Sequence, residues 1–200
     1  MKTKRALTTA LLAGSLLISS GPTVAGTIKG KVTIARARNL ADMVVYVEKA
    51  PGDFTPPKKH AVMDQKNLVF IPHVLPAVVG STVDFLNSDQ VLHNVFTPDK
   101  CAKKFNLGTW PRGEVRSMKF DQIGCSAVLL CNVHPEMEAY VVVLQNPYFA
   151  VTDKSGLYAI PDVPEGTYTL RVWNKKSLEF SQQVTVPKQG DATADLKLKG

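Results

Sequence analysis

The chain has 200 residues, which is enough for one or two small domains. Its apolar fraction of 44% is ordinary for a globular protein and argues against disorder. The formal net charge is +7, and three positive charges at residues 2–5 lie in a segment that we expect to be removed, which leaves +4. That charge is too small and too evenly spread to indicate a nucleic-acid-binding protein.

Residues 1–25 have the pattern of a secretory signal peptide. A basic start at residues 2–5 precedes an apolar run at residues 6–18, and small residues at 23–25 are typical of a cleavage site. A retained membrane anchor is the less favoured interpretation because the apolar run is too short to span a bilayer. We therefore expect export to the periplasm, removal of the signal and no stable membrane insertion of the mature chain.

The rest of the chain predicts short strands and turns, with no convincing helix. Candidate strands lie at residues 28–34, 44–47, 68–71, 74–79, 82–87, 115–120, 126–130 and 139–144. The last of these is a near-continuous apolar run, which is typical of a strand that is buried or packed between sheets. Past residue 147 the pattern changes to short alternating strands with frequent turn residues. The sequence therefore predicts an all-β protein.

One short loop concentrates metal-binding side chains. Cys131, His134 and Met137 follow one another at a Cys-x2-His-x2-Met spacing, and His93 supplies a second imidazole upstream. Two His, one Cys and a weak axial Met are the ligand set that suits a redox-active copper ion. Zinc is the main competing metal, but Met is a soft ligand that zinc rarely uses. The structural alternative is a buried Cys beside an ordinary turn His.

With these residues in view, the chain resembles the type 1 (blue) copper cupredoxins. The stretch 80–94 has the pattern Gly-x2-Val-x-Phe-x-Asn-x-Asp-x3-His-Asn, and the short ligand loop looks most like that of amicyanin and of periplasmic cupredoxins of the methylamine utilisation type. The resemblance implies a Greek-key β-sandwich that binds one type 1 copper per chain. It assigns as ligands His93, Cys131, His134 and Met137. It also implies that the side chain of Asn94 ties the two ligand loops together.

The resemblance implies a function in electron transfer. A protein of this kind passes one electron between redox proteins, such as a c-type cytochrome or a periplasmic dehydrogenase or reductase, with electron exit through His134. The alternative is a periplasmic copper carrier or sensor without a relay role. An enzyme is disfavoured because the four histidines are too few for the extra copper centres of copper oxidases and nitrite reductases, unless another chain contributes.

The C-terminal segment, residues 148–200, looks like a carboxypeptidase regulatory-like, or transthyretin-like, β-sandwich module. About fifty residues is short for an independent core, so we expect this segment to dock on the rest of the chain. The cupredoxin domain is placed at residues 26–147. Residues 26–47 also fit the C-terminal module, in which case the copper domain would be inserted into a split sandwich. The sequence leaves this choice open.

Three cysteines leave one over after pairing. Cys125 and Cys131 lie six residues apart, which is roughly 20 Å on a straight strand and too far for a disulfide. We therefore expect a Cys101–Cys125 disulfide, and two free thiols are the alternative. His60 and His73 lie outside the motif, and we interpret both as surface loop residues.

Overall fold

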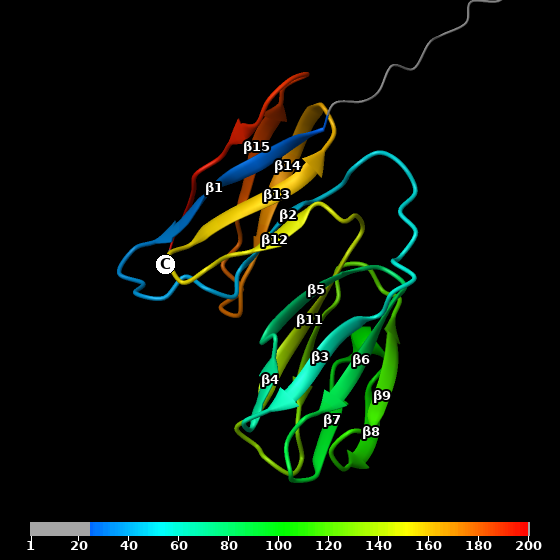
Figure 1. The fold of residues 1–200 in the computed structure, drawn as a ribbon. Coiled ribbons are helices and arrows are strands. Elements are labelled where there is room, and N and C mark those ends of the chain that lie inside the picture. Colours follow the sequence, from blue (N-terminus) through cyan, green and yellow to red (C-terminus); the bar gives the residue numbers. More distant parts are fainter. Residues whose placement is uncertain (1–24, 200) are drawn as a thin grey trace, which may run out of the picture.

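The structure, a computed structural model, describes residues 25–199 (Figure 1). The predicted signal peptide therefore lies outside the described residues, apart from Ala25. The regular elements of the described part are strands and one short 3-10 turn, η1 (Lys100–Ala102). The strands form two β-sandwiches. It has no helix of the length and apolarity needed to cross a membrane. The all-β sandwich class predicted from the sequence is confirmed.

The first sandwich, here called the inserted sandwich, is built from residues 61–144. One sheet has the order β5 (Val74–Val78), β11 (Glu138–Leu144), β10 (Ser126–Leu130), β7 (His93–Thr97) and β8 (Phe105–Trp110). The facing sheet has the order β4 (Val69–Ile71), β3 (Ala61–Lys66), β6 (Ser81–Asn87) and β9 (Val115–Phe120). The pairs β5–β11 and β3–β6 are parallel, and the other neighbours are antiparallel.

Alternation along the strands explains how the inserted sandwich forms its core. In β6 the side chains of Ser81, Val83, Phe85 and Asn87 are buried and the residues between them are partly exposed. This period of two directs one face of the strand toward the facing sheet. The core also includes Trp110, Leu129 and other apolar side chains from both sheets. Strands β3, β7 and β8 were not among the predicted strands.

The second sandwich, here called the split sandwich, combines the two ends of the described chain. One sheet contains β13 (Leu157–Val163), β1 (Gly26–Ile34), β16 (Ala192–Thr193) and β17 (Leu196–Leu198). The other has the order β12 (Phe149–Val151), β2 (Val44–Val47), β14 (Gly166–Trp173) and β15 (Ser181–Val186). Residues 26–47 thus pair with the C-terminal strands. The inserted sandwich lies between β2 and β12 in the sequence, and these two strands are direct neighbours (Figure 1).

Strand β11 is covered on both faces. Its residues Ala139, Val141 and Val143 point into the core of the inserted sandwich. On the opposite face, Val142 and Leu144 are buried in a separate cluster against the split sandwich. A strand with two covered faces needs apolar side chains at consecutive positions, which accounts for the unbroken apolar run in the sequence.

Candidate metal centre

Three of the four predicted ligands meet at one end of the inserted sandwich. His93 is the first residue of β7, Cys131 directly follows β10, and His134 lies in the loop from β10 to β11. The Sγ of Cys131 is 4.0 Å from the Nδ1 of His93 and 4.0 Å from the Nδ1 of His134. The two Nδ1 atoms are 3.2 Å apart. A single ion could therefore contact all three side chains.

The cluster is largely shielded from solvent. His93 is fully buried, Cys131 is a buried free cysteine, and His134 is half-buried. Among residues 25–199 it is the group of His, Cys, Asp or Glu side chains that is placed to share one metal ion. Two imidazole nitrogens and one thiol are borderline and soft donors, so the residues present fit a copper ion.

Met137 closes the ligand loop. Its backbone N–H donates to the carbonyl oxygen of His134 at 3.0 Å, which forms a turn at the end of the loop. Its side chain is buried in the same core cluster as Cys131. The structure thus places the fourth predicted ligand on the loop that carries Cys131 and His134, with its thioether inside the sandwich.

Asn94 connects the two segments that carry the ligands. Its Oδ1 accepts a hydrogen bond from the backbone N–H of Asn132, the neighbour of Cys131, at 3.2 Å. Its Nδ2 donates to the Oδ1 of Asn106 and to the carbonyl of Gly108, both at 2.8 Å. The side chain is buried and three hydrogen bonds fix it, so it links the His93 strand to the Cys131 loop.

Asp89 orients the first histidine, and sequence reasoning missed this role. Its Oδ2 lies 2.9 Å from the Nε2 of His93. The same carboxylate accepts hydrogen bonds from the backbone N–H groups of Asn67 and Leu68, at 2.7 and 3.0 Å. These two residues lie in the turn between β3 and β4. Partial burial raises the pKa of Asp89, but the hydrogen bonds from Leu68, His93 and Asn67 outweigh that effect and the pKa lies below its usual value.

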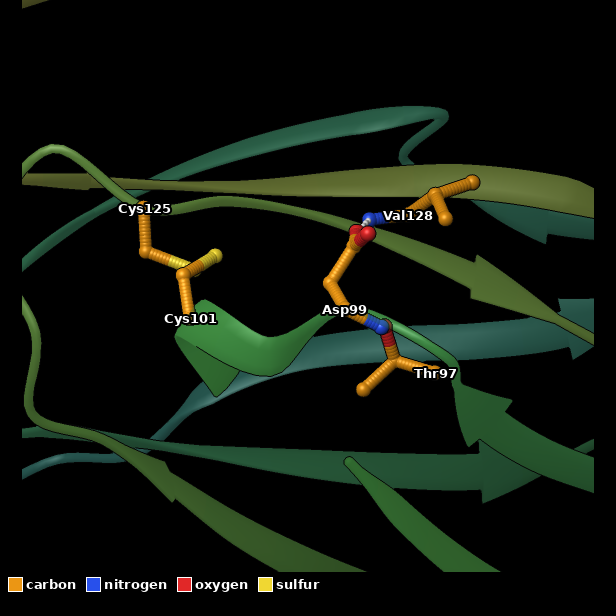
Figure 2. The surroundings of a disulfide bond; sticks show 5 residues. All are labelled: Thr97, Asp99, Cys101, Cys125 and Val128. Atoms are coloured by element: carbon orange, nitrogen blue, oxygen red, sulfur yellow. Dashed lines mark hydrogen bonds between the residues drawn. A yellow bond between two sulfur atoms is a disulfide. The ribbon is translucent and has the colours of Figure 1, made fainter. Parts of the chain in front are cut away.

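A disulfide bridge joins Cys101 to Cys125, as predicted (Figure 2). It ties η1 to the start of β10, the strand that leads to Cys131. Close to it, the carboxylate of Asp99 accepts the backbone N–H of Val128 at 2.7 Å. Only one residue pair, Leu130 with Phe96, joins β10 to β7 in register. Beyond that pair, Asp99 and the disulfide keep β10 attached to the segment that follows β7.

The other two histidines lie away from the ligand cluster. His60 contacts the carboxylate of Asp84 at 2.9 Å and is exposed. His73 contacts the carboxylate of Asp42 at 3.0 Å and therefore bridges the two sandwiches. The side chain of His73 is 39% exposed, in the loop between β4 and β5, so the surface position expected from the sequence is confirmed, while its contact with Asp42 was not predicted.

Comparison with protein families gives one partial match. A family model described as polysaccharide lyase family 4, domain II, matches residues 127–194, or 68 of the 200 residues. The matched stretch begins in β10 and runs through the ligand loop into the split sandwich. The description differs from the carboxypeptidase regulatory-like module expected from the sequence, which stays a prediction. A search of curated proteins finds no match.

Comparison with solved structures finds cupredoxins. A reduced tryptophan-to-tyrosine variant of amicyanin is 23% identical with a TM-score of 0.40, covering 44% of this chain and 91% of its own. A purple cupredoxin from Nitrosopumilus maritimus is 26% identical with a TM-score of 0.37, covering 42% and 98%. A copper-containing nitrite reductase from Thermus scotoductus SA-01 is 20% identical with a TM-score of 0.41, covering 56% and 28%.

Proposed function

We propose that the chain is a periplasmic type 1 copper protein that passes single electrons between redox proteins and is not itself an enzyme. The observation that carries this proposal is the meeting of His93, Cys131 and His134, whose ligand atoms lie within 4.8 Å of one another. These three residues would hold one copper ion, with the thioether of Met137 as a fourth, weaker donor. The donor set is the one expected for such a site.

The neighbouring residues of the chain keep the donor atoms in place. Copper held by two imidazoles and a thiolate supplies a one-electron couple between Cu(I) and Cu(II). Asp89 orients the ring of His93, and Asn94 fixes the backbone beside Cys131. The burial of His93 and Cys131 excludes water. Because hydrogen bonds fix these side chains, we expect them to move little when the oxidation state changes.

Electron exchange with partners would take place at His134. This residue is half-buried, and exposed apolar side chains flank the two histidine ligands in the sequence, with Leu92 52% and Val133 44% exposed. Apolar patches of this kind suit transient docking. We expect the partners to be a c-type cytochrome or a periplasmic dehydrogenase or reductase. Export through the predicted signal peptide would bring the chain to such partners.

Copper reconstitution of the protein without residues 1–25 tests the proposal. We expect one copper per chain and a strong visible band from the thiolate–copper bond. Cys131→Ser should abolish the band, whereas Val133→Ala, a change in the same loop, should retain it. If Cys131→Ser kept the colour and the redox response, the proposal would be wrong.

A second measurement separates the relay role from copper storage or sensing. Stopped-flow mixing of the oxidised protein with a reduced c-type cytochrome should show fast loss of the visible band. Copper binding in wild type without a thiolate band would instead support the alternative of a periplasmic copper carrier or sensor.

A further inference from the structure

The strand that leaves the ligand loop is held from outside by the split sandwich. Glu138 is the first residue of β11 and directly follows Met137, and its carboxylate forms an ion pair with Lys175. Two residues on, the ring of Tyr140 lies 5.1 Å from the ring of Trp173. Both contacts join the end of the metal-binding loop to the C-terminal end of β14 and the residues that follow it.

Tyr140 is enclosed by several groups. The ammonium of Lys175 lies 5.8 Å from the centre of its ring, and the ring of His73 lies 5.9 Å away on an edge contact. Its backbone N–H donates to the carbonyl of His73 at 2.9 Å. His73 in turn contacts Asp42, so the N-terminal part of the split sandwich is linked to this tyrosine through His73.

The apolar contact beneath these groups is continuous. Val142 and Leu144 of β11 pack with Val44 and Val74, so both sandwiches contribute to one buried cluster. The connections between the sandwiches are also tied together, because the side chain of Gln145 forms two hydrogen bonds with the backbone of Ala50. Side chains on this outer face of β11 have little room to shift independently of the split sandwich.

We propose that the split sandwich is a positioning platform for the metal-binding loop, with Trp173 and Lys175 as its positioning residues. They fix Tyr140 and Glu138, and these fix the end of the loop at which Met137 enters the core. The proposal rests on the proposed copper function for its purpose, but the contacts themselves do not require a metal. It gives the second sandwich a role at the site, even though it contributes no ligand there.

Hydrogen exchange in the metal-free protein tests the platform directly. The amide of Met137 donates to His134 within the loop, so its exchange rate reports loop opening. We expect Trp173→Leu to raise that rate about fivefold, since an aromatic pair contributes this order of stabilisation. Phe54→Leu is the matched control, because it removes the Phe54–Tyr148 ring pair, which lies away from β11. An unchanged Met137 rate in folded Trp173→Leu would overturn the proposal.

Lys175 offers a second variant if Trp173→Leu does not fold. Lys175→Met should speed exchange at Met137, Lys175→Arg should restore the slow rate, and Lys176→Met at the neighbouring exposed lysine should have no effect. Equal rates in all three proteins would contradict a positioning role for Lys175.

Copper loading separates this proposal from the proposed function. In a copper-binding wild type, Trp173→Leu should shift the position of the visible band and the reduction potential, whereas Phe54→Leu should not. If wild type binds no copper, the proposed function fails and the exchange result still stands. If wild type shows the visible band but the Met137 exchange rates of the variants equal that of wild type, the platform proposal is wrong and the proposed copper function is retained.

Discussion

The carboxylate of Asp89 contacts the Nε2 of His93, while the Nδ1 on the other side of the ring faces Cys131 and His134. The pKa of Asp89 lies below its usual value, so the carboxylate is ionised at neutral pH. It can therefore only accept a hydrogen bond, and the nitrogen that faces it carries the proton. This contact assigns the proton of the neutral ring to Nε2 and leaves the lone pair of Nδ1 directed at the site. A carboxylate on the non-ligating nitrogen is a recurrent feature of metal-binding histidines.

Removing this carboxylate should weaken metal binding. We expect Asp89→Ala to lower copper affinity about 10- to 100-fold, the usual effect of losing a partner behind a metal ligand. Asp89→Asn should lose less, because its amide oxygen can still accept from His93. Competition titration with a chelator of known affinity measures both variants. Copper affinity equal to wild type in Asp89→Ala would show that the ring is held by packing alone.

The Cys101–Cys125 bridge should stabilise the metal-free protein. The residues are 24 apart in the sequence, and closing a loop of this length stabilises the folded state by about 3 kcal/mol. We therefore expect the Cys101→Ala, Cys125→Ala double variant to lose about that much in urea unfolding. Reduction of wild type should produce a similar loss and leave the double variant unaffected. A double variant as stable as oxidised wild type would contradict this assignment.

Tyr158 should make the split sandwich sensitive to alkaline pH. Its hydroxyl donates to the carbonyl of Ala194 at 2.6 Å, and burial raises its pKa above the usual value, with a further contribution from the carboxylate of Asp195. A raised pKa means that the neutral form is favoured in the folded state. This contribution is fully present below pH about 10, the pKa of an unfolded tyrosine, and is lost as pH rises toward the folded pKa.

Tyr158→Phe tests that pH dependence. At pH 8 we expect the variant to be about 1 to 2 kcal/mol less stable, because the carbonyl of Ala194 loses its partner. Between pH 8 and pH 11 the difference from wild type should shrink by about 1 kcal/mol. Urea unfolding at the two pH values measures it, and the other tyrosines are common to both proteins. A difference of constant size would mean that Tyr158 titrates normally.

Local patterns in the sequence were sufficient for much of the site. Cys131, His134 and Met137 share one short loop, so their spacing alone places them together, and His93 was identified from the pattern of residues 80–94, which resembles that of the cupredoxins. The cysteine pairing followed from strand length. Asp89 was missed because its role depends on the amides of Asn67 and Leu68, which come from a hairpin that the sequence did not predict.

The missed strands and the split sandwich share a physical cause. Strand β3 contains Asp64, Gln65 and Lys66. In β8 the alternation of Phe105 and Leu107 is too short to identify a strand, because Gly108 and Thr109 follow. Residues 61–66 form strand β3 because they pair with β6, and the fully buried Gln65 donates a hydrogen bond to the carbonyl of Leu86 in that strand. The assignment of residues 26–47 depends on partners more than a hundred residues away, which local patterns do not specify.

The interruption of the split sandwich has a consequence for the order of folding. The amide of Thr27 bonds to Asp191, 164 residues later, whereas every strand of the inserted sandwich comes from one contiguous stretch. Contacts so distant in sequence form slowly and only once both ends of the polypeptide have emerged. We therefore expect the inserted sandwich to fold early and the split sandwich to assemble last.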